Sequence, residues 1–175
     1  AMEHQSLHDA LTGLPNRIQY EIELEAAVAA ASFEAKAVLI LNDLDRFKQI
    51  NDRHGHQAGD HVLQEAARAL SKGLRASDVL ARYGGEEFVL LLPATGTQRA
   101  AEIAERLRAA VASLALAPAR GVSLRVTASF GLASLAVDQR ATLEDPGLWL
   151  LRQADLALYA AKARGRNCVA VADRS

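Results

Sequence analysis

The feature that most constrains how this chain folds is a glycine pair, Gly84-Gly85, set between two short apolar runs. The runs at 79–81 and 89–92 have the composition of strands, and glycine takes positive φ without steric penalty, so the segment predicts a β-hairpin. Helical and strand-like segments alternate on both sides of it. Because the two strands of a hairpin are antiparallel, we expect a mixed sheet.

Helical spacing of apolar residues and continuous apolar runs predict the remaining elements. Asn16 and Thr97 are expected to cap the helices that they begin. Residues 54–59 are expected to form a break rich in glycine, and the strand at 122–130 to carry one polar face. The order of elements predicts an α/β (α+β) fold in which helices flank a mixed central sheet of about five strands, with a ferredoxin-like core. We expect helices over 16–33, 46–53, 60–73, 97–115 and 147–164, and strands over 36–44, 122–130 and 167–172.

Composition is that of an ordinary globular domain. The chain has 175 residues, of which 50% are hydrophobic and 23% are charged, so a single domain over 1–175 is expected. A net charge of −1 gives no basic field, which argues against nucleic acid or a membrane surface as a partner. Cys168 is the only cysteine, so a disulfide framework and a cysteine-based zinc site are excluded.

Hydropathy predicts a cytoplasmic location for this part of the protein. No apolar run approaches the roughly 20 residues of a membrane span, and no signal peptide is recognisable. Ala1-Met2 is typical of an expression scar, and residues 1–8 are expected to comprise that scar and the end of a linker helix. We therefore expect a piece of a longer signalling protein, whose missing N-terminal part could anchor it to a membrane.

Two acidic pairs are the first candidates for chemistry. Asp43 and Asp45 end an apolar run, and positions i and i+2 of a strand share a face, as the ligands of a divalent cation must. Glu86-Glu87 follows the glycine pair, and a cation would relieve the repulsion of adjacent carboxylates. If the two strands are neighbours, Asp43 and Glu86 face each other, which is the layout of a two-magnesium nucleotidyl-transfer site. A solvated strand end is the alternative for the first pair.

Polar residues beyond the first acidic pair suit a nucleotide. A helix that begins directly after Asp45 would point free N–H groups at a phosphate. Asn51 and Asp60 carry the groups that read the Watson–Crick edge of guanine, although each is also common in turns and caps. Lys162 and Arg166 either complement a helix C-terminus or bind phosphate.

Two further clusters have competing interpretations. Arg75 and Asp78 form either an ordinary surface ion pair or a second guanine-binding pair. His54, His56 and His61 lie close in sequence, but a metal site there is disfavoured because the loop lacks a fourth ligand.

Four segments, taken in order, resemble the GGDEF family of diguanylate cyclases, which implies a palm-type nucleotide cyclase core. The resemblance spans residues 7–172, and it departs from the family pattern only slightly. Glu86 stands where the family more often has Asp, and Asn42 where a hydrophobic residue is more usual. The matching segments are 9–17 (DALTGLPNR), 43–60 (DLDRFKQINDRHGHQAGD), 82–88 (RYGGEEF) and 154–167 (ADLALYAAKARGRN).

The resemblance implies a reaction and a metal site. Two GTP molecules would be condensed into cyclic di-GMP with release of two pyrophosphates, and a homodimer would be needed because one domain holds one GTP. Asp43 and Glu86, with the carbonyl of Leu44, would bind two Mg²⁺ ions, for which Mn²⁺ could substitute. Glu86 would also help to deprotonate the attacking hydroxyl, and Glu87 would assist at the metal and hold the turn.

The resemblance also assigns residues to the substrate and the product. Guanine would be recognised by Asn51 and Asp60, with His56 nearby. The triphosphate would be held by the N–H groups of Phe47 and Lys48 and by the side chains of Lys162 and Arg166. Product inhibition would use the family's Arg-x-x-Asp motif, here Arg75 and Asp78, completed by Arg106.

Three other functions compete with a cyclase. A receptor that only binds cyclic di-GMP is disfavoured by the intact RYGGEEF turn. A GTP-binding domain that regulates a fused enzyme is a second possibility, and no such enzyme lies within these residues. A cyclase for another nucleotide is a third, and the pair Asn51 and Asp60 argues against ATP.

Overall fold

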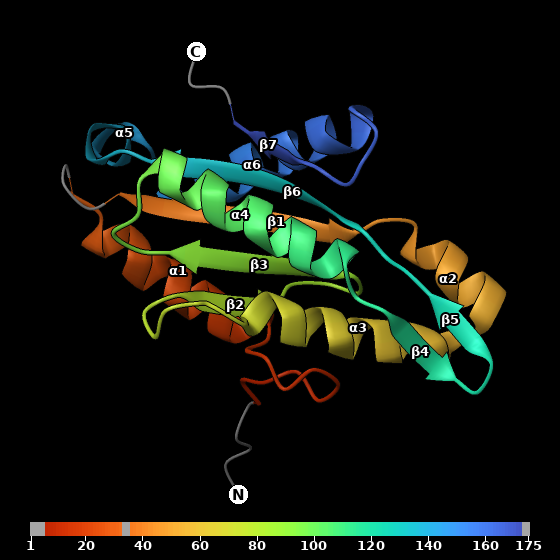
Figure 1. The fold of residues 1–175 in the computed structure, drawn as a ribbon. Coiled ribbons are helices and arrows are strands. Elements are labelled where there is room, and N and C mark those ends of the chain that lie inside the picture. The colour runs from red at the N-terminus through yellow and green to blue at the C-terminus, as the bar shows by residue number, and fades with distance from the viewer. Residues whose placement is uncertain (1–5, 33–35, 173–175) are drawn as a thin grey trace, which may run out of the picture.

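The predicted hairpin forms one edge of a five-stranded mixed sheet (Figure 1). The structure is a computed structural model, and it describes residues 6–32 and 36–172. The strand order is β2-β3-β1-β6-β7, in which every neighbouring pair is antiparallel except β6 and β7. The mixed sheet expected from the sequence is therefore confirmed. The strands are β1 (Ala37–Leu44), β2 (Val79–Arg82), β3 (Glu87–Leu92), β6 (Ala128–Leu135) and β7 (Val169–Val171).

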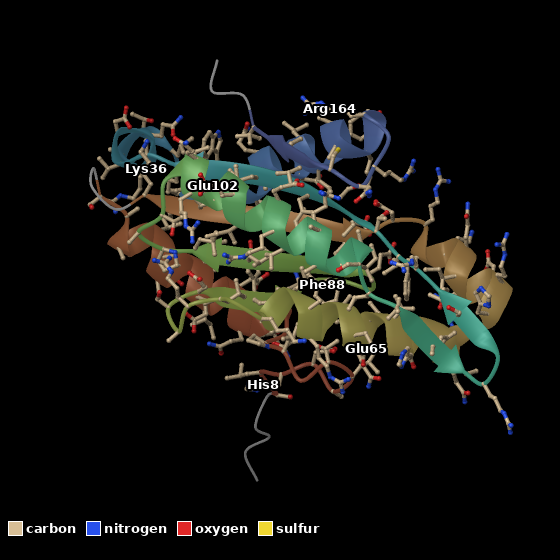
Figure 2. All side chains as sticks on the ribbon, viewed as in Figure 1. His8, Lys36, Glu65, Phe88, Glu102 and Arg164 are labelled. Carbon is tan, nitrogen blue, oxygen red and sulfur yellow. The ribbon has the colours of Figure 1, made fainter. Side chains whose placement is uncertain are left out.

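Helices cover both faces of this sheet. Helices α1 (Arg17–Ala30) and α6 (Pro146–Ala163) pack on one face, and α3 (His56–Ser71) and α4 (Thr97–Ala112) pack on the other (Figure 1). Because side chains alternate along a strand, Phe88 of β3, labelled in Figure 2, lies in the core under α3 and α4. Two shorter helices follow strands, α2 (Phe47–His54) after β1 and α5 (Val137–Thr142) after β6.

The two strands at the centre of the sheet are buried along their whole length. All eight residues of β1 and all eight of β6 are buried, which confirms the expectation for β1. The expectation of one strand with a polar face over 122–130 was wrong. That span contains the second strand of a separate two-stranded sheet (122–124), three linking residues (125–127) and the start of β6, so its alternating sequence does not belong to one strand. The separate sheet pairs β4 (Leu116–Ala119) with β5 (Val122–Leu124).

Two helix starts also differ from the expectation. Helix α3 begins at His56, so the break after α2 is Gly55 alone, with φ 90°, rather than residues 54–59. Helix α4 begins at Thr97 with Gly96 at the N-cap, and the Thr97 hydroxyl instead donates to Ser134 Oγ at 3.1 Å. Asn16 caps α1 as expected, because its Oδ1 accepts from the Gln19 N–H at 3.2 Å.

The N-terminal segment leads into α1 as an irregular loop. Of the scar and linker helix expected over 1–8, residues 1–5 lie outside the described residues, and 6–8 are not helical. His8 instead pairs with Pro15 in an isolated bridge. Within the described part of the chain, every helix is too short or too polar to cross a lipid bilayer.

Candidate active site

The turn between β2 and β3 is closed by its own backbone and by one arginine. The Tyr83 and Gly84 N–H groups donate to the Glu87 carbonyl at 2.9 and 3.3 Å. Arg82 donates to the Gly85 carbonyl at 2.8 Å from one guanidinium nitrogen and to Asp9 at 3.1 Å from another. Asp9 is held in turn by Thr12, whose N–H and hydroxyl donate to it at 2.9 and 2.8 Å. The loop before α1 therefore supports the turn.

The glycine pair in this turn does not serve the purpose predicted for it. Neither Gly84 nor Gly85 has a positive φ, so the prediction of left-handed backbone there was wrong. A Cβ on Gly85 would meet no described atom within 4 Å, and one on Gly84 would meet only Glu87 at 3.9 Å. Packing within the described chain would tolerate a side chain at both positions. The absent side chains instead leave the backbone of the turn open to close approach from outside.

The two acidic pairs lie on neighbouring strands, as the metal-site hypothesis required. Strand β1 is antiparallel to β3, and the residue directly opposite Asp43 is Glu87 rather than Glu86. Glu86 lies one position before the strand, where its carbonyl accepts from the Leu44 N–H at 3.2 Å. The expected face-to-face pair of Asp43 and Glu86 is therefore displaced by one residue, because the register between β1 and β3 pairs Asp43 with Glu87.

Asp43 is buried next to a cation. Its side chain forms an ion pair through Oδ2 with Lys162 Nζ of α6, and the residue is only 8% exposed. The second oxygen, Oδ1, is buried without a hydrogen-bond partner among the described residues. An acceptor left in this condition is costly, so this oxygen is suited to accept from a donor or to bind a cation.

The electrostatics of the cluster also favour a cation. Burial raises the pKa of Asp43, Lys162 opposes the rise, and the Glu86 and Asp45 carboxylates add to it. Burial likewise raises the pKa of Glu87, with further contributions from Asp43 and from Asp155 of α6. Within the described residues, no three His, Cys, Asp or Glu side chains are grouped closely enough to enclose a metal ion alone. The buried Asp43 oxygen beside the Glu86 and Glu87 carboxylates fits a cation such as Mg²⁺, which is held by one or two carboxylates and completes its shell with water or a substrate phosphate.

Asp43 and Asp45 do not act as a pair of similar groups. Asp45 lies beyond the end of β1 and accepts from the Thr127 hydroxyl at 2.7 Å and the Ser129 hydroxyl at 2.6 Å. It also accepts from the Asn167 N–H at 3.0 Å. The sequence reasoning that aimed both carboxylates at one cation was therefore wrong for Asp45, because neighbouring hydroxyls and an amide occupy its oxygens.

Candidate phosphate-binding groups border this cluster. Helix α2 begins at Phe47 after Arg46, and no described side chain caps this N-terminus. The first N–H groups of a helix have no carbonyl partner within it, so those of Phe47 and Lys48 remain available. Lys162 already lies against Asp43, and Arg166 is exposed in the loop that follows α6. The sequence predicted each of these residues, but not the contact between Lys162 and Asp43.

Candidate guanine-binding groups lie at the junction of α2 and α3. The Asn51 Oδ1 is buried and has no partner among the described residues, whereas Asp60 and His56 are exposed at the start of α3. A Cβ on Gly59 would lie 1.8 Å from Asn51 Oδ1, so only glycine leaves room for this side chain. The structure therefore places Asn51 beside the residue that precedes Asp60, with an acceptor unused.

The predicted inhibitory residues border one cavity of about 220 Å³. Arg75 donates to Asp78 Oδ1 at 3.0 Å, to the Pro93 carbonyl at 2.9 Å and to Thr95 Oγ1 at 2.8 Å. Arg106 of α4 lies on the same cavity and donates to the Gly73 carbonyl at 3.4 Å. Arg99, in the first turn of α4, also lines the cavity and was missed, because the sequence offers only helical spacing as a signal.

A family model and two curated relatives all relate this chain to diguanylate cyclases. The family described as "Diguanylate cyclase, GGDEF domain" matches residues 6–168. The diguanylate cyclase DgcP of Pseudomonas aeruginosa is 42% identical over 96% of this chain and 24% of its own length. The diguanylate cyclase DgcM of Escherichia coli is 41% identical over 98% of this chain and 40% of its own length. The chain thus spans less than half of these relatives.

A solved structure of similar extent has the same fold. The GGDEF domain of DgcB from Caulobacter crescentus, in complex with c-di-GMP, superposes with a TM-score of 0.88 at 32% identity. The match covers 98% of both chains.

Proposed function

The chain belongs to the GGDEF family of diguanylate cyclases, and we propose that it is a catalytic domain that condenses two GTP molecules into cyclic di-GMP and two pyrophosphates. The single observation that supports this most strongly is the buried oxygen of Asp43, beside the Glu86-Glu87 turn, that has no hydrogen-bond partner among the described residues. A site with one excess acceptor and several carboxylates is suited to a cation that also binds phosphate.

Asp43 and Glu86, with the Leu44 carbonyl, are the proposed ligands of two Mg²⁺ ions, and Mn²⁺ is a substitute. When bound, such ions stabilise the charge that develops on the α-phosphate and lower the pKa of the attacking hydroxyl. Glu86 takes the proton from the 3′-hydroxyl, and Glu87 holds the turn through the hydrogen bonds that its carbonyl accepts. A cation bound at Asp43 would neutralise the carboxylate that now pairs with Lys162, and Lys162 would then be available to bind the phosphates.

The remaining groups orient the substrate. The N–H groups of Phe47 and Lys48 and the side chain of Arg166 bind the triphosphate, since a free helix N-terminus favours anions. Asn51 and Asp60 recognise guanine, with His56 at the edge of the site, and the unused Asn51 oxygen is available to a base N–H. The open backbone at Gly85 lets the nucleotide approach the turn closely.

Ring closure requires a second copy of the domain. One domain offers groups for one GTP, whereas two phosphodiester bonds must form between two nucleotides. We therefore propose a homodimer in which two sites face each other, each presenting its GTP to the other. Because GTP is the substrate, the domain acts in the cytoplasm.

Product inhibition is proposed at the cavity bordered by Arg75, Asp78 and Arg106. A guanidinium suits O6 and N7 of guanine, and a carboxylate suits its N1–H and N2–H₂ groups. In the structure Arg75 is occupied by Asp78, Pro93 and Thr95, so guanine would exchange with these internal partners rather than bind a free arginine.

Product analysis tests this function. The purified protein, incubated with GTP and Mg²⁺ at high concentration, should form cyclic di-GMP identifiable by mass, and ATP should give no cyclic product. Glu86→Ala should lower the rate at least about 100-fold, the usual cost of losing a group that acts on the reacting atoms. Glu65→Ala, on the surface of α3 (Figure 2), is the matched control and should leave the rate unchanged. A concentrated sample that forms no cyclic di-GMP would overturn the proposal.

A further inference from the structure

We infer that Asp45 and Arg108 are positioning residues that together hold Asn167, and through it the phosphate-binding Arg166. The inference rests on the proposed function, because it concerns how a group of that site is kept in place. It gives a role to two residues, Asp45 and Arg108, that take no part in the proposed binding of metal, guanine or phosphate.

Asp45 has the surroundings of an anchor rather than of a metal ligand. The residue is 7% exposed, and its carboxylate accepts from three donors that belong to two other segments of the chain. The Ser129 hydroxyl donates to it from β6, and the Thr127 hydroxyl donates from the residue before that strand. The Asn167 N–H donates to it from the loop after α6. Unlike Asp43, it keeps no buried oxygen without a partner among the described residues. Three short bonds to one buried carboxylate favour a single fixed geometry.

The loop that Asp45 holds has an uncommon backbone. Arg166 and Asn167 are consecutive residues with φ 67° and φ 49°, in the left-handed region that residues other than glycine rarely adopt. Such a conformation persists only where the surroundings determine it strongly. Here the Arg166 N–H donates to the Ala161 carbonyl at 3.1 Å and the Asn167 N–H donates to Asp45.

Arg108 secures the other side of Asn167. It lies on α4 and is 20% exposed, and its Nε donates to both Glu105 oxygens at 3.0 Å. With its orientation fixed in this way, it donates to Asn167 Oδ1 at 2.8 Å. Asn167 is thus bound through its backbone by Asp45 and through its side chain by Arg108. The neighbouring Arg166 starts from a fixed Cα, so less conformational freedom is lost when it binds phosphate.

The test separates the triphosphate from the base. The probes are α,β-methylene GTP with Mg²⁺, whose α–β bond resists cleavage, and GMP, which has the same base but lacks the β- and γ-phosphates. Arg108→Ala should weaken the GTP analogue about three- to tenfold, the effect of one hydrogen bond, and leave GMP affinity unchanged. Calorimetry on the intact protein measures both.

A double-mutant cycle with Arg166 shows whether Arg108 acts through it. In an Arg166→Ala background, Arg108→Ala should cause no further loss, because the group that it positions is gone. Arg68→Ala is the matched control, since Arg68 also pairs with a glutamate three residues earlier but belongs to α3. It should leave both affinities unchanged. Equal losses for the GTP analogue and GMP, or additive losses in the double variant, would overturn the inference.

Asp45 is tested by removing its donors singly, because Asp45→Asn itself risks unfolding. Ser129→Ala keeps the carboxylate but deletes one bond, and it should weaken binding of the GTP analogue while GMP affinity is again unchanged. Undiminished affinity for the GTP analogue, or equal losses for both ligands, would remove Asp45 from the inference. Thermal unfolding identifies any variant that is not folded. If the wild-type protein bound no GTP analogue, or if Arg166→Ala had no effect on it, the proposed phosphate site would fail and the inference with it. Failure of the cycle alone would leave the proposed function intact.

Discussion

At the scale of single residues, the clearest evidence for a ligand lies in side-chain oxygens that the protein itself leaves unused. Asp43 Oδ1 and Asn51 Oδ1 are both buried without partners among the described residues. They belong to different elements, and the same resemblance assigns them to the metal and to the base. Tyr20 and Asn42 also hold buried polar atoms without a partner among the described residues. Asp43 and Asn51 differ from them because the resemblance assigns both to one site, where groups of the substrate would pair with their oxygens.

Gly59 is predicted to be essential because of Asn51. A methyl group at position 59 would lie 1.8 Å from Asn51 Oδ1, so Gly59→Ala must displace that side chain. We expect GTP affinity to fall at least about tenfold, the cost of losing a guanine contact. The double variant Gly59→Ala/Asn51→Ala should bind GTP no more weakly than the single variant Asn51→Ala, as measured by calorimetry. A Gly59→Ala protein with undiminished affinity would remove Asn51 from the base site.

Asp9 is predicted to stabilise the protein in a way that depends on pH. Burial alone would raise its pKa, but hydrogen bonds from Thr12 and the Arg82 guanidinium outweigh burial and hold the pKa below its usual value. The ionised form therefore favours folding, fully so above the unfolded pKa of about 3.9, and this stabilisation is lost as pH falls through the lower folded value.

Replacing Asp9 tests this. Asp9→Asn should lower the free energy of unfolding by about 1–3 kcal/mol at pH 7, since hydrogen bonds to an ionised group are lost. The difference between variant and wild type should shrink when denaturant unfolding is repeated below pH 3. A difference of the same size at both pH values would show that the charge of Asp9 is irrelevant to folding.

At the scale of elements, the position of α6 depends on one glycine in β6. A Cβ on Gly131 would lie 2.2 Å from the Ala154 carbonyl oxygen and the Leu158 nitrogen, both of which are backbone atoms of α6. The helix therefore approaches the sheet more closely than any side chain would permit. Because α6 carries Lys162 and leads into Arg166, the close contact between helix and sheet helps to determine how near both cations lie to Asp43.

Gly131→Ala is accordingly expected to be destabilising. Backbone cannot move aside as a flexible side chain can, so the free energy of unfolding should fall by about 2–3 kcal/mol, as for overpacking of a core. Gly85→Ala is the matched control, because a Cβ there meets no described atom within 4 Å, and its stability should stay within about 0.5 kcal/mol of wild type. Denaturant unfolding of both variants measures this, and equal stability of the two would contradict the packing argument.

The elements that the sequence predicts well are those whose signal is local. The segment 36–44 contains an uninterrupted apolar run at 37–41, and β1 (Ala37–Leu44) is buried throughout. The β4–β5 pair was not predicted, because its strands have only four and three residues, too few for a period to appear, and because Pro118 within β4 is unusual in a strand. The prediction of a single strand over 122–130 failed for the same reason, because β5 is too short to be recognised as a separate strand.

At the scale of the whole molecule, the site depends on contacts that no local pattern contains. Lys162 meets Asp43 across 119 positions of sequence, and Asn167 meets Asp45 across 122. Residue types and motif order named Lys162 and Asp43 as candidates, but only the packing of α6 on the sheet brings them together. The sequence also could not predict that Asp43 and Asp45 have different partners. The hydroxyls that donate to Asp45 belong to Thr127 and Ser129, which lie 82 and 84 positions away in the sequence.

The central claim is that each domain carries half of a cyclase, and its most direct test is the rate of cyclic di-GMP formation as protein concentration is varied. With saturating GTP and Mg²⁺ and trace product, two half-sites must meet, so the initial rate should rise with the square of protein concentration while the protein is mainly monomeric. It should become linear once dimers predominate. A rate strictly proportional to concentration throughout a range in which sedimentation shows only monomer would contradict the account.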